Sequence, residues 1–202
     1  MMKIVLAESE LELVPESIRH HKSVKRPKDG GGVLLDSNFH HSAMKDLPEA
    51  YKRGRPDIVH VCLLNALDSP LNRAGSLEFY VHTRNDDVIE MSPKWRVPRS
   101  YNRFVGLMEN LFEQRTIEHD KDMLLNMKKM GLAELIDSIS DGMEVKLMHY
   151  QGRRYAPSED SVIIIGGFPH GDFKEDLGFE KYSICSEELM AWSVVNHVIY
   201  TL

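Results

Sequence analysis

The pattern of apolar and polar positions along this chain alternates between short apolar runs and stretches with helical spacing. Residues 161–165 carry four consecutive β-branched side chains without a polar interruption, which is typical of a strand covered on both faces of a parallel sheet. Residues 101–114 place apolar side chains on one helical face, which predicts a helix that covers such a sheet. The expected strands are residues 3–7, 33–36, 77–83, 87–91, 143–148, 161–165 and 180–185, and the expected helices are residues 9–20, 57–67, 101–114, 121–139 and 187–201. Because strands alternate with helices, the sequence predicts an α/β fold.

Turn and breaker residues refine these elements. Arg84-Asn85-Asp86 separates two strand patterns and predicts a hairpin. Pro15 disturbs the helical pattern of residues 9–20, and a further helix could begin at His40. Residues 22–32 are basic and end in three glycines, which favours a mobile loop.

The composition is that of a globular protein. The chain has 202 residues, of which 42% are hydrophobic and 28% charged, so one sizeable domain is expected over residues 1–202. Residues around 77–140 could form an inserted β-hairpin and helical extension of that domain.

The same composition indicates a cytoplasmic protein that does not bind membranes. The apolar runs are too short to cross a bilayer, and the first ten residues become acidic too early for a secretory signal. Cys62 and Cys185 lie far apart in apolar contexts, so we expect two buried free thiols in a reducing compartment.

A basic segment stands out against the net charge of −6. Residues 94–103 carry four cationic side chains and no carboxylate. The planar guanidinium fork suits phosphate, and Tyr101 and Phe104 could offer stacking faces to bases. The segment therefore indicates an anion or RNA site, the alternative being a solvated basic loop. The acidic net charge argues against indiscriminate binding to nucleic acid, so a few placed arginines would have to supply the affinity.

Two turns at the ends of predicted strands are candidates for binding a small ligand. Residues 161–171 run from a buried strand into a glycine-rich turn, where the backbone can approach a ligand closely. The spacing fits neither a dinucleotide fingerprint nor a P-loop. Residues 182–189 form a second strand-to-helix turn with Ser186 as a candidate N-cap. Adjacent in space, the two turns would form a crevice; otherwise each is a tight turn or a capped helix.

Several single residues could carry chemistry. Asp57 could pair with an arginine and fix it in place, and Asp68 could act as a base or as a helix cap. The ten histidines occur without an HExxH or CxxC pattern, so no metal site is expected.

The order of motifs resembles one family. The segments RPDIVHVCLLNALDSPLNRAG, LEFYVHT, RVPRSYNRFVGLMENLF, VIIIGGFPHGDF and YSICSEELMAWSVVNHVIY are similar to those of the ribosome-biogenesis pseudouridine-N1-specific methyltransferases of archaea and eukaryotes, which belong to the SPOUT superfamily. The resemblance covers nearly the whole chain, and the compact length and the GGFPHG turn resemble the archaeal members more closely.

The resemblance implies a SPOUT-type Rossmann-like sheet with a C-terminal trefoil knot, a homodimer, S-adenosylmethionine as cofactor and small-subunit ribosomal RNA as partner. It implies an RNA-binding surface formed by Arg55, Arg96, Arg99 and Arg103, with Asp57 as structural support, and it places Asp68 nearest the acceptor base. The implied cofactor-binding residues are Ile165, Gly166, Gly167, Gly171, Ser183, Ile184, Cys185 and Leu189.

The implied reaction is methylation of N1 of a pseudouridine, with Asp68 either taking the N1 proton or orienting the ring. Two alternatives belong to other classes. The chain could be a non-catalytic assembly factor that binds pre-ribosomal RNA, or a small-molecule enzyme whose arginines hold one anionic substrate.

Overall fold

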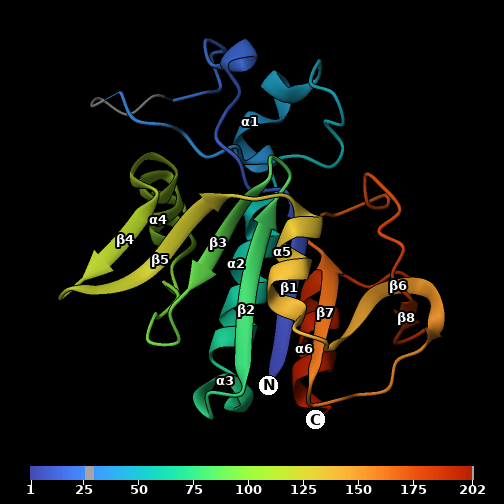
Figure 1. The fold of residues 1–202 in the computed structure, drawn as a ribbon. Helices are drawn as coiled ribbons and strands as arrows, with labels where there is room; N and C mark the ends of the chain where they lie inside the picture. Colours follow the sequence, from blue (N-terminus) through green and yellow to red (C-terminus); the bar gives the residue numbers. More distant parts are fainter. Residues whose placement is uncertain (26–29, 202) are drawn as a thin grey trace.

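An eight-stranded mixed sheet forms the centre of the computed structural model, which describes residues 1–25 and 30–201 (Figure 1). The strands are β1 (Met2–Ser9), β2 (Leu77–Thr83), β3 (Asp87–Met91), β4 (Thr116–His119), β5 (Asp122–Lys129), β6 (Glu144–Arg154), β7 (Ser161–Gly166) and β8 (Lys181–Ser183). They follow the order β4-β5-β3-β2-β1-β7-β6-β8 across the sheet. The neighbours β2, β1, β7, β6 and β8 are parallel, whereas β3, β5 and β4 extend the sheet antiparallel. The predicted α/β fold and the hairpin at residues 84–86 are therefore confirmed.

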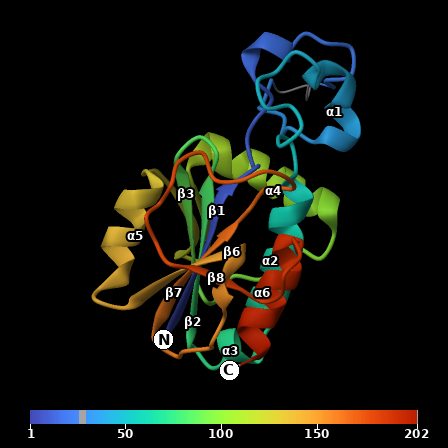
Figure 2. The same ribbon diagram turned by 90° about the vertical axis from the view of Figure 1, so that its right-hand side faces the viewer.

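Helices cover both faces of the parallel part. The helices are α1 (Ser37–Met44), α2 (Pro56–Leu67), α3 (Pro70–Arg73), α4 (Tyr101–Gln114), α5 (Leu132–Ser140) and α6 (Ala191–Tyr200), with a short 3-10 helix η1 (Glu16–Ile18). In the edge view of Figure 2, α2 and α6 lie on one face of the sheet and α5 on the other. Along β7, Ile163 and Ile165 belong to the core under α2 and α6, while Val162 and Ile164 belong to the core under α5. This alternation confirms the prediction that residues 161–165 form a strand buried on both faces.

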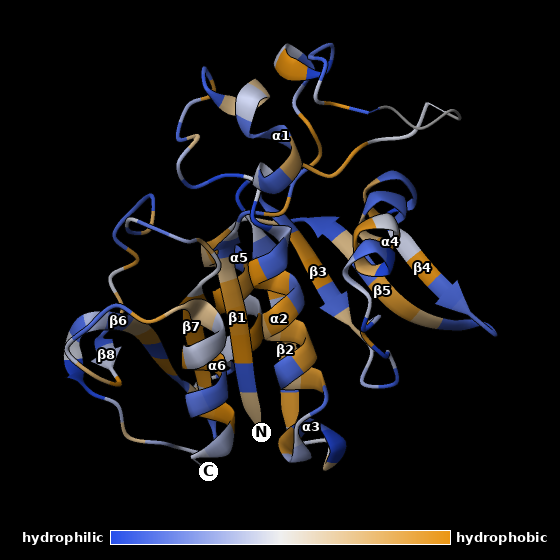
Figure 3. Ribbon diagram, turned by 180° about the vertical axis from the view of Figure 1, so that it is seen from behind, coloured by the Kyte–Doolittle hydropathy of each residue, from blue (hydrophilic) through white to orange (hydrophobic). Residues whose placement is uncertain are grey.

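The hydrophobic residues concentrate in the central strands and on the helices that pack against them (Figure 3). None of the helices in the described ranges has both the length and the apolar character that a membrane span requires.

Residues 10–55, which we term the cap, project beyond the carboxyl ends of the parallel strands (Figures 1 and 2). The cap holds η1 and α1 and has a small core of its own, made by Leu35, Met44 and Leu47. The predicted helix over residues 9–20 is wrong, because the chain stays extended there and only Glu16–Ile18 is helical. The predicted strand at 33–36 is reduced to one bridge, between Leu34 and Leu13.

The single amphipathic pattern predicted for residues 121–139 divides into β5 and α5. The division falls at Gly131, the N-cap of α5, and β5 is drawn into the sheet between β3 and β4. The final helix begins at Ala191 rather than at residue 187. Of the loop predicted at 22–32, residues 26–29 lie outside the described residues.

Candidate functional site

The two turns predicted from the sequence, the glycine-rich turn after β7 and the turn after β8, meet at the carboxyl ends of these strands. Together they line a concave cavity of about 120 Å³ that opens to solvent. The middle of β6, at residues 148–150, supplies a third wall, which the sequence prediction missed. Seven of the eight expected residues line this cavity: Ile165, Gly166, Gly171, Ser183, Ile184, Cys185 and Leu189.

Gly167, the eighth, faces β1 instead of the cavity. Its N–H donates to the Ala7 carbonyl at 2.7 Å, and its carbonyl accepts from the Glu10 N–H at 3.2 Å. A β-carbon at this position would lie 2.3 Å from Ser9 Oγ and 2.7 Å from Ser9 Cα. A glycine is therefore required here so that the turn can be bound tightly to the end of β1.

The second turn is held by short-range bonds of its own. Ser183 Oγ donates to the Cys185 carbonyl, and Cys185 Sγ contacts the Glu187 carbonyl at 3.5 Å. The predicted N-cap at Ser186 is wrong, since Met190 occupies the N-cap of α6 and no side chain caps it. The turn therefore continues past Ser186 around the cavity, as far as Leu189 and Ala191.

The two cysteines differ from each other. Cys62 is buried in α2, and burial raises the pKa of its thiol. Cys185 is exposed at the cavity, so the prediction of two buried thiols is wrong for this residue. Ile184 of the same turn packs against the main core, whereas residues 185–189 are exposed.

Polar and aromatic groups close the side of the cavity next to β6. His149 Nε2 lies 3.3 Å from a carboxylate oxygen of Asp172, and Phe173 packs edge-to-face on Phe168 with ring centroids 5.2 Å apart. His149 Nδ1 accepts from the Gln151 N–H at 3.2 Å, so the Nε2–H points to Asp172. The strand predicted over residues 143–148 leads into this wall. Nothing in the sequence of that strand showed which loop the wall would contact.

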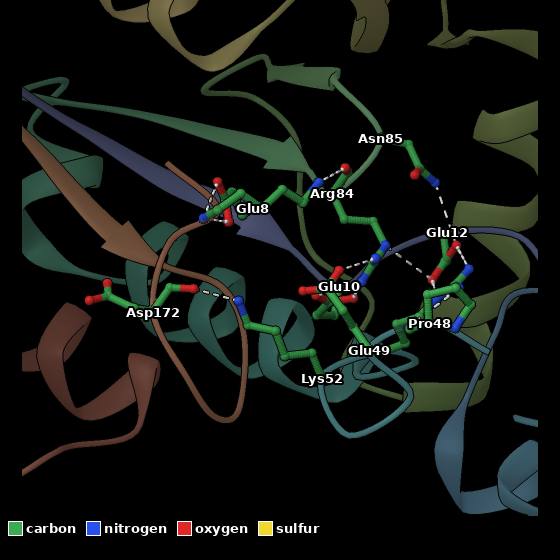
Figure 4. Close-up of polar contacts among 11 residues, drawn as sticks. Glu8, Glu10, Glu12, Pro48, Glu49, Lys52, Arg84, Asn85 and Asp172 are labelled. Atoms are coloured by element: carbon green, nitrogen blue, oxygen red, sulfur yellow. Dashed lines mark hydrogen bonds and ion pairs between the residues drawn. The ribbon is translucent and has the colours of Figure 1, made fainter. Parts of the chain in front are cut away.

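A network of buried charges supports the sheet edge beneath the cavity (Figure 4). Glu10 accepts two hydrogen bonds from Arg84 Nη1, at 2.9 and 2.7 Å, and Arg84 Nη2 donates to Glu49 at 3.0 Å. Glu12 accepts a bidentate pair from Arg53 at 2.8 and 2.7 Å. The Arg84 bonds fix the cap to the β2–β3 turn, and the Arg53–Glu12 pair lies within the cap. The sequence signal for this network was the alternation of Glu8, Glu10 and Glu12 directly after the strand predicted at residues 3–7.

Glu8, the first of these glutamates, bonds instead to the loop that follows β7. Both of its carboxylate oxygens accept from the Lys174 N–H at 3.1 Å, and burial raises the pKa of the Glu8 carboxyl. Lys174 Nζ in turn donates to the Arg84 carbonyl. The loop is thus tied to the same edge from which the cap projects.

The basic segment forms a surface along α2 and α4. His60 of α2 bonds through Nε2 to the Pro98 carbonyl at 2.7 Å and stacks on Phe104 with ring centroids 4.5 Å apart. These contacts hold the segment, while Arg96, Arg99 and Arg103 remain exposed. We term these three residues, with Arg55, the arginine surface. Phe104 is buried in the core, so it offers no face to a base as the sequence suggested.

Arg55 is fixed in place as predicted. Its Nε and Nη2 each donate to one carboxylate oxygen of Asp57 at 2.8 Å. The Asp57 bond also raises the pKa of the Arg55 guanidinium, although burial opposes this shift. Tyr101 bonds through its hydroxyl to Asp36 close by, which places a half-buried tyrosine at the side of Arg55.

Asp68 lies at the other end of α2, where it occupies the C-cap position. It is exposed and pairs with Arg73 at 2.5 Å. The bond to Arg73 holds the pKa of Asp68 below its usual value, and the charges of Arg99 and Arg96 act in the same direction. Asp68 therefore faces the arginine surface and lies at the amino-terminal edge of the parallel strands, away from the cavity.

Within one chain the structure does not bring the cavity and the arginine surface together. Helix α2 packs against α4 on one side and α6 on the other, and both helices are seen flanking it in Figure 3. The arginines lie on the α4 side, and the cavity lies beyond α6, near β8. Within the described ranges, no three His, Cys, Asp or Glu side chains gather so as to hold a metal ion.

The fold and the site define an α/β protein with a cavity at its strand ends and a separate arginine surface. The chain belongs to the EMG1/NEP1 methyltransferase family, whose sequence profile matches residues 4–202. The resemblance found in the motifs is thereby confirmed.

Individual relatives are similar to this chain over nearly their full lengths. The ribosomal RNA small subunit methyltransferase Nep1 of Thermococcus onnurineus is 49% identical over 214 residues, covering 98% of this chain and 96% of the relative. The Nep1 of Pyrococcus furiosus is 48% identical, covering 98% and 94%. The crystal structure of Archaeoglobus fulgidus Nep1 bound to S-adenosylhomocysteine superposes with a TM-score of 0.86 at 42% identity, covering 98% and 94%.

Proposed function

We propose that this chain transfers a methyl group from S-adenosylmethionine to N1 of a pseudouridine in small-subunit ribosomal RNA during ribosome biogenesis. The observation that carries the proposal is the cavity in which the glycine-rich turn after β7 meets the turn after β8, in a chain similar over nearly its full length to ribosomal RNA methyltransferases. The Archaeoglobus relative binds S-adenosylhomocysteine, the product that this reaction would leave behind.

The cavity fits this cofactor. Backbone groups of the turn at Gly166 and Gly171 are accessible because neither residue has a side chain, and Ile165, Ile184 and Leu189 add an apolar lining suited to a nucleoside. When bound, S-adenosylmethionine supplies an electrophilic methyl group on a sulfonium, and its transfer requires alignment rather than a metal. The turns would provide that alignment, since both are bonded to the ends of neighbouring strands.

The arginine surface would hold the RNA. Arg96, Arg99 and Arg103 are exposed, and guanidinium groups at short spacing suit successive phosphates. Arg55 is already oriented by Asp57, so it would lose little freedom on binding. The target base must leave any stack to meet the methyl group, and the arginines would grip the flanking backbone while it does.

Asp68 would act on the acceptor base by hydrogen bonding rather than as a strong base. Its lowered pKa keeps the carboxylate ionised at neutral pH and makes it a weak proton acceptor. A fixed carboxylate can accept the N1–H and so orient the ring, while the departing proton passes to solvent.

A homodimer would bring the separated parts together. Val61 and Leu64 on α2 and Trp192 on the neighbouring α6 are only partly buried, and they would supply an apolar face for the contact. A two-fold contact through this face would set the arginine surface and Asp68 of one chain next to the cavity of its partner.

We further infer a cytoplasmic protein with a single SPOUT-type domain whose C-terminal segment from β7 to α6 forms a trefoil knot.

Labelled methyl transfer tests the proposed reaction. The purified protein is incubated with radiolabelled S-adenosylmethionine and an RNA hairpin that carries one pseudouridine, next to the matching uridine hairpin. We expect label only on the pseudouridine hairpin, and equal labelling of both would refute N1 of pseudouridine as acceptor. Absence of both heat and thermal shift with S-adenosylmethionine would favour the non-catalytic assembly factor.

Mixed dimers test the shared site. Cys185→Trp fills the cavity from an exposed position, and Arg99→Ala with Arg103→Ala removes the phosphate grip. Each variant alone should be inactive. If the site is shared, mixing and re-annealing the two variants restores activity, because one pocket of each mixed dimer has an intact cavity and an intact partner surface. Activity that stays absent after confirmed subunit exchange would contradict sharing.

A further inference from the structure

Lys52 reaches from the cap into the loop that closes the cavity. Its ammonium donates to the Asp172 carbonyl at 2.5 Å and lies 4.1 Å from the centroid of the Phe168 ring. Figure 4 shows the side chain extended toward Asp172. Both Phe168 and Asp172 line the cavity, whereas Lys52 itself stands behind them. A β-carbon on Gly171 would lie 3.4 Å from Lys52 Cε, so the lysine stem packs under the turn as well.

The ammonium occupies a costly position. Lys52 is 5% exposed, and among the described residues its ammonium makes no ion pair within 4.0 Å of a carboxylate oxygen. The Lys52 charge acts on Glu8 and Glu10 only at longer range. There it lowers the pKa of each carboxyl, which burial raises. Removing a charge from water without a close partner is unfavourable, and an apolar side chain of similar length would fill the same space at lower cost. Packing alone therefore does not account for a lysine here.

Among the described residues, both contacts of the Lys52 ammonium lie on one loop. A carbonyl and a ring face are groups that an ammonium binds, and they belong to residues 168 and 172, one on each side of the turn. The aromatic pair Phe168–Phe173 and the His149–Asp172 contact depend on the same loop conformation. One cation thus holds both arms of the turn against the cap.

We propose that Lys52 is a positioning residue that keeps the loop of residues 168–172 in the shape that binds the cofactor. This inference rests on the proposed function in so far as the cavity is the cofactor site. Lys52 touches neither the cofactor nor the RNA, so its effect is on the affinity of the cavity. The cap thereby contributes to cofactor binding, although none of its described residues lines the cavity.

Three substitutions grade the interaction. Lys52→Met keeps the stem and removes both contacts, Lys52→Gln keeps a hydrogen-bond donor without the charge, and Lys52→Arg keeps both a donor and a cation. Titration calorimetry with S-adenosylhomocysteine should give a Kd raised about tenfold or more for Met, an intermediate value for Gln, and a value within about threefold of the wild type for Arg. Lys45→Met, at an exposed position at the end of α1 in the same cap, is the control and should leave the Kd unchanged.

Thermal unfolding and hydrogen exchange distinguish a positioning role of Lys52 from a purely structural one. The Tm of Lys52→Met should equal or exceed that of the wild type, because a buried charge has been removed, while the amides of residues 168–174 should exchange faster in the free protein. A Kd for Lys52→Met within twofold of the wild type would overturn the inference, as would a lowered Tm with unchanged cofactor affinity. If Lys52→Met does not fold, equal affinities of the Arg and Gln variants would overturn it instead.

The same data distinguish this inference from the proposed function. Wild-type protein that binds S-adenosylhomocysteine but does not label the RNA hairpin would refute the proposed acceptor and leave the role of Lys52 intact. Wild-type protein without affinity for S-adenosylhomocysteine would overturn both.

Discussion

The cavity and the arginine surface are built in opposite ways. The cavity is formed by backbone turns that are bonded to the ends of buried strands, and its supports are ion pairs shielded from water, such as Glu10 with Arg84. The arginine surface consists of the exposed Arg96, Arg99 and Arg103, on a segment that His60 bonds to α2, and of the half-buried Arg55 at the start of α2. One site depends on where the main chain lies, and the other depends on which side chains are present.

This difference predicts how each site fails. A small change in side-chain volume or charge beneath the cavity displaces the backbone, and the displacement extends along the sheet edge. A change on the arginine surface removes one contact and leaves the rest of the fold intact, since substitutions at exposed positions usually alter stability by no more than about 0.5 kcal/mol. The predictions below test this contrast.

The largest effect is expected from Arg84→Met. The substitution leaves the Glu10 carboxylate buried without its partner and should lower the free energy of unfolding by about 3–5 kcal/mol. Arg99→Met, an equal change of charge on the arginine surface, should leave stability nearly unchanged. Urea denaturation of both variants provides the measurement, and similar losses in the two would contradict the contrast.

Gly167→Val should abolish most cofactor affinity. A β-carbon would approach Ser9 Cα to 2.7 Å, so the turn has to move off β1 and the cavity loses its shape. We expect the Kd for S-adenosylhomocysteine to rise about a hundredfold, with a fall in stability of about 1–3 kcal/mol. Gly106→Ala, in α4 with open space around the added methyl group, is the matched control and should bind normally. A Gly167→Val protein with wild-type affinity would show that the turn tolerates displacement.

Arg99→Ala and Arg103→Ala should each weaken RNA binding about three- to tenfold while the affinity for S-adenosylhomocysteine stays constant. Each lost phosphate contact should also reduce the slope of log K against log salt by about 0.7 on single-stranded RNA. Fluorescence anisotropy over a salt series measures both quantities, with Lys121→Ala at the β4–β5 turn as the control. An unchanged salt slope would mean that these arginines do not contact phosphate.

The smallest effect concerns pH. Burial lowers the pKa of both His40 and His82 below the ordinary value of 6.5. Each Nδ1 accepts from a backbone N–H, of Asp36 at 3.0 Å and of Glu8 at 3.2 Å, and protonation would break that bond. The unfolded chain therefore binds more protons as pH falls through 6.5, and stability should decrease in that direction by up to about 1.4 kcal/mol per pH unit for each histidine.

Denaturation at pH 7.5 and 6.0 checks this pH dependence. His82→Gln should reduce the loss of unfolding free energy between pH 7.5 and 6.0. The arginine surface, whose guanidinium groups do not titrate in this range, should bind RNA equally at both pH values. A pH-independent stability of the wild type would contradict the role assigned to these histidines.

The same contrast explains what the sequence could predict. Residues 161–165 carry both the strand and its burial in their side chains, and the turn that follows carries its glycines, so this half of the cavity was predictable from local patterns. The position of Gly167 against β1, the His149 wall and Lys52 result from contacts between segments far apart in the chain, which no local pattern encodes. The error at residues 121–139 has the same origin, since pairing with β3 and β4 determined β5, whereas the apolar spacing alone favoured a helix.

One paired binding experiment tests the separation of the two sites most directly. Cys185→Trp and the double variant Arg99→Ala with Arg103→Ala are each titrated with S-adenosylhomocysteine and with the RNA hairpin. The cavity variant should lose the cofactor and keep the RNA, and the arginine variant should lose the RNA and keep the cofactor. Loss of both ligands in either variant, or loss of the opposite one, would contradict the assignment of the cavity to the cofactor and of the arginines to the RNA.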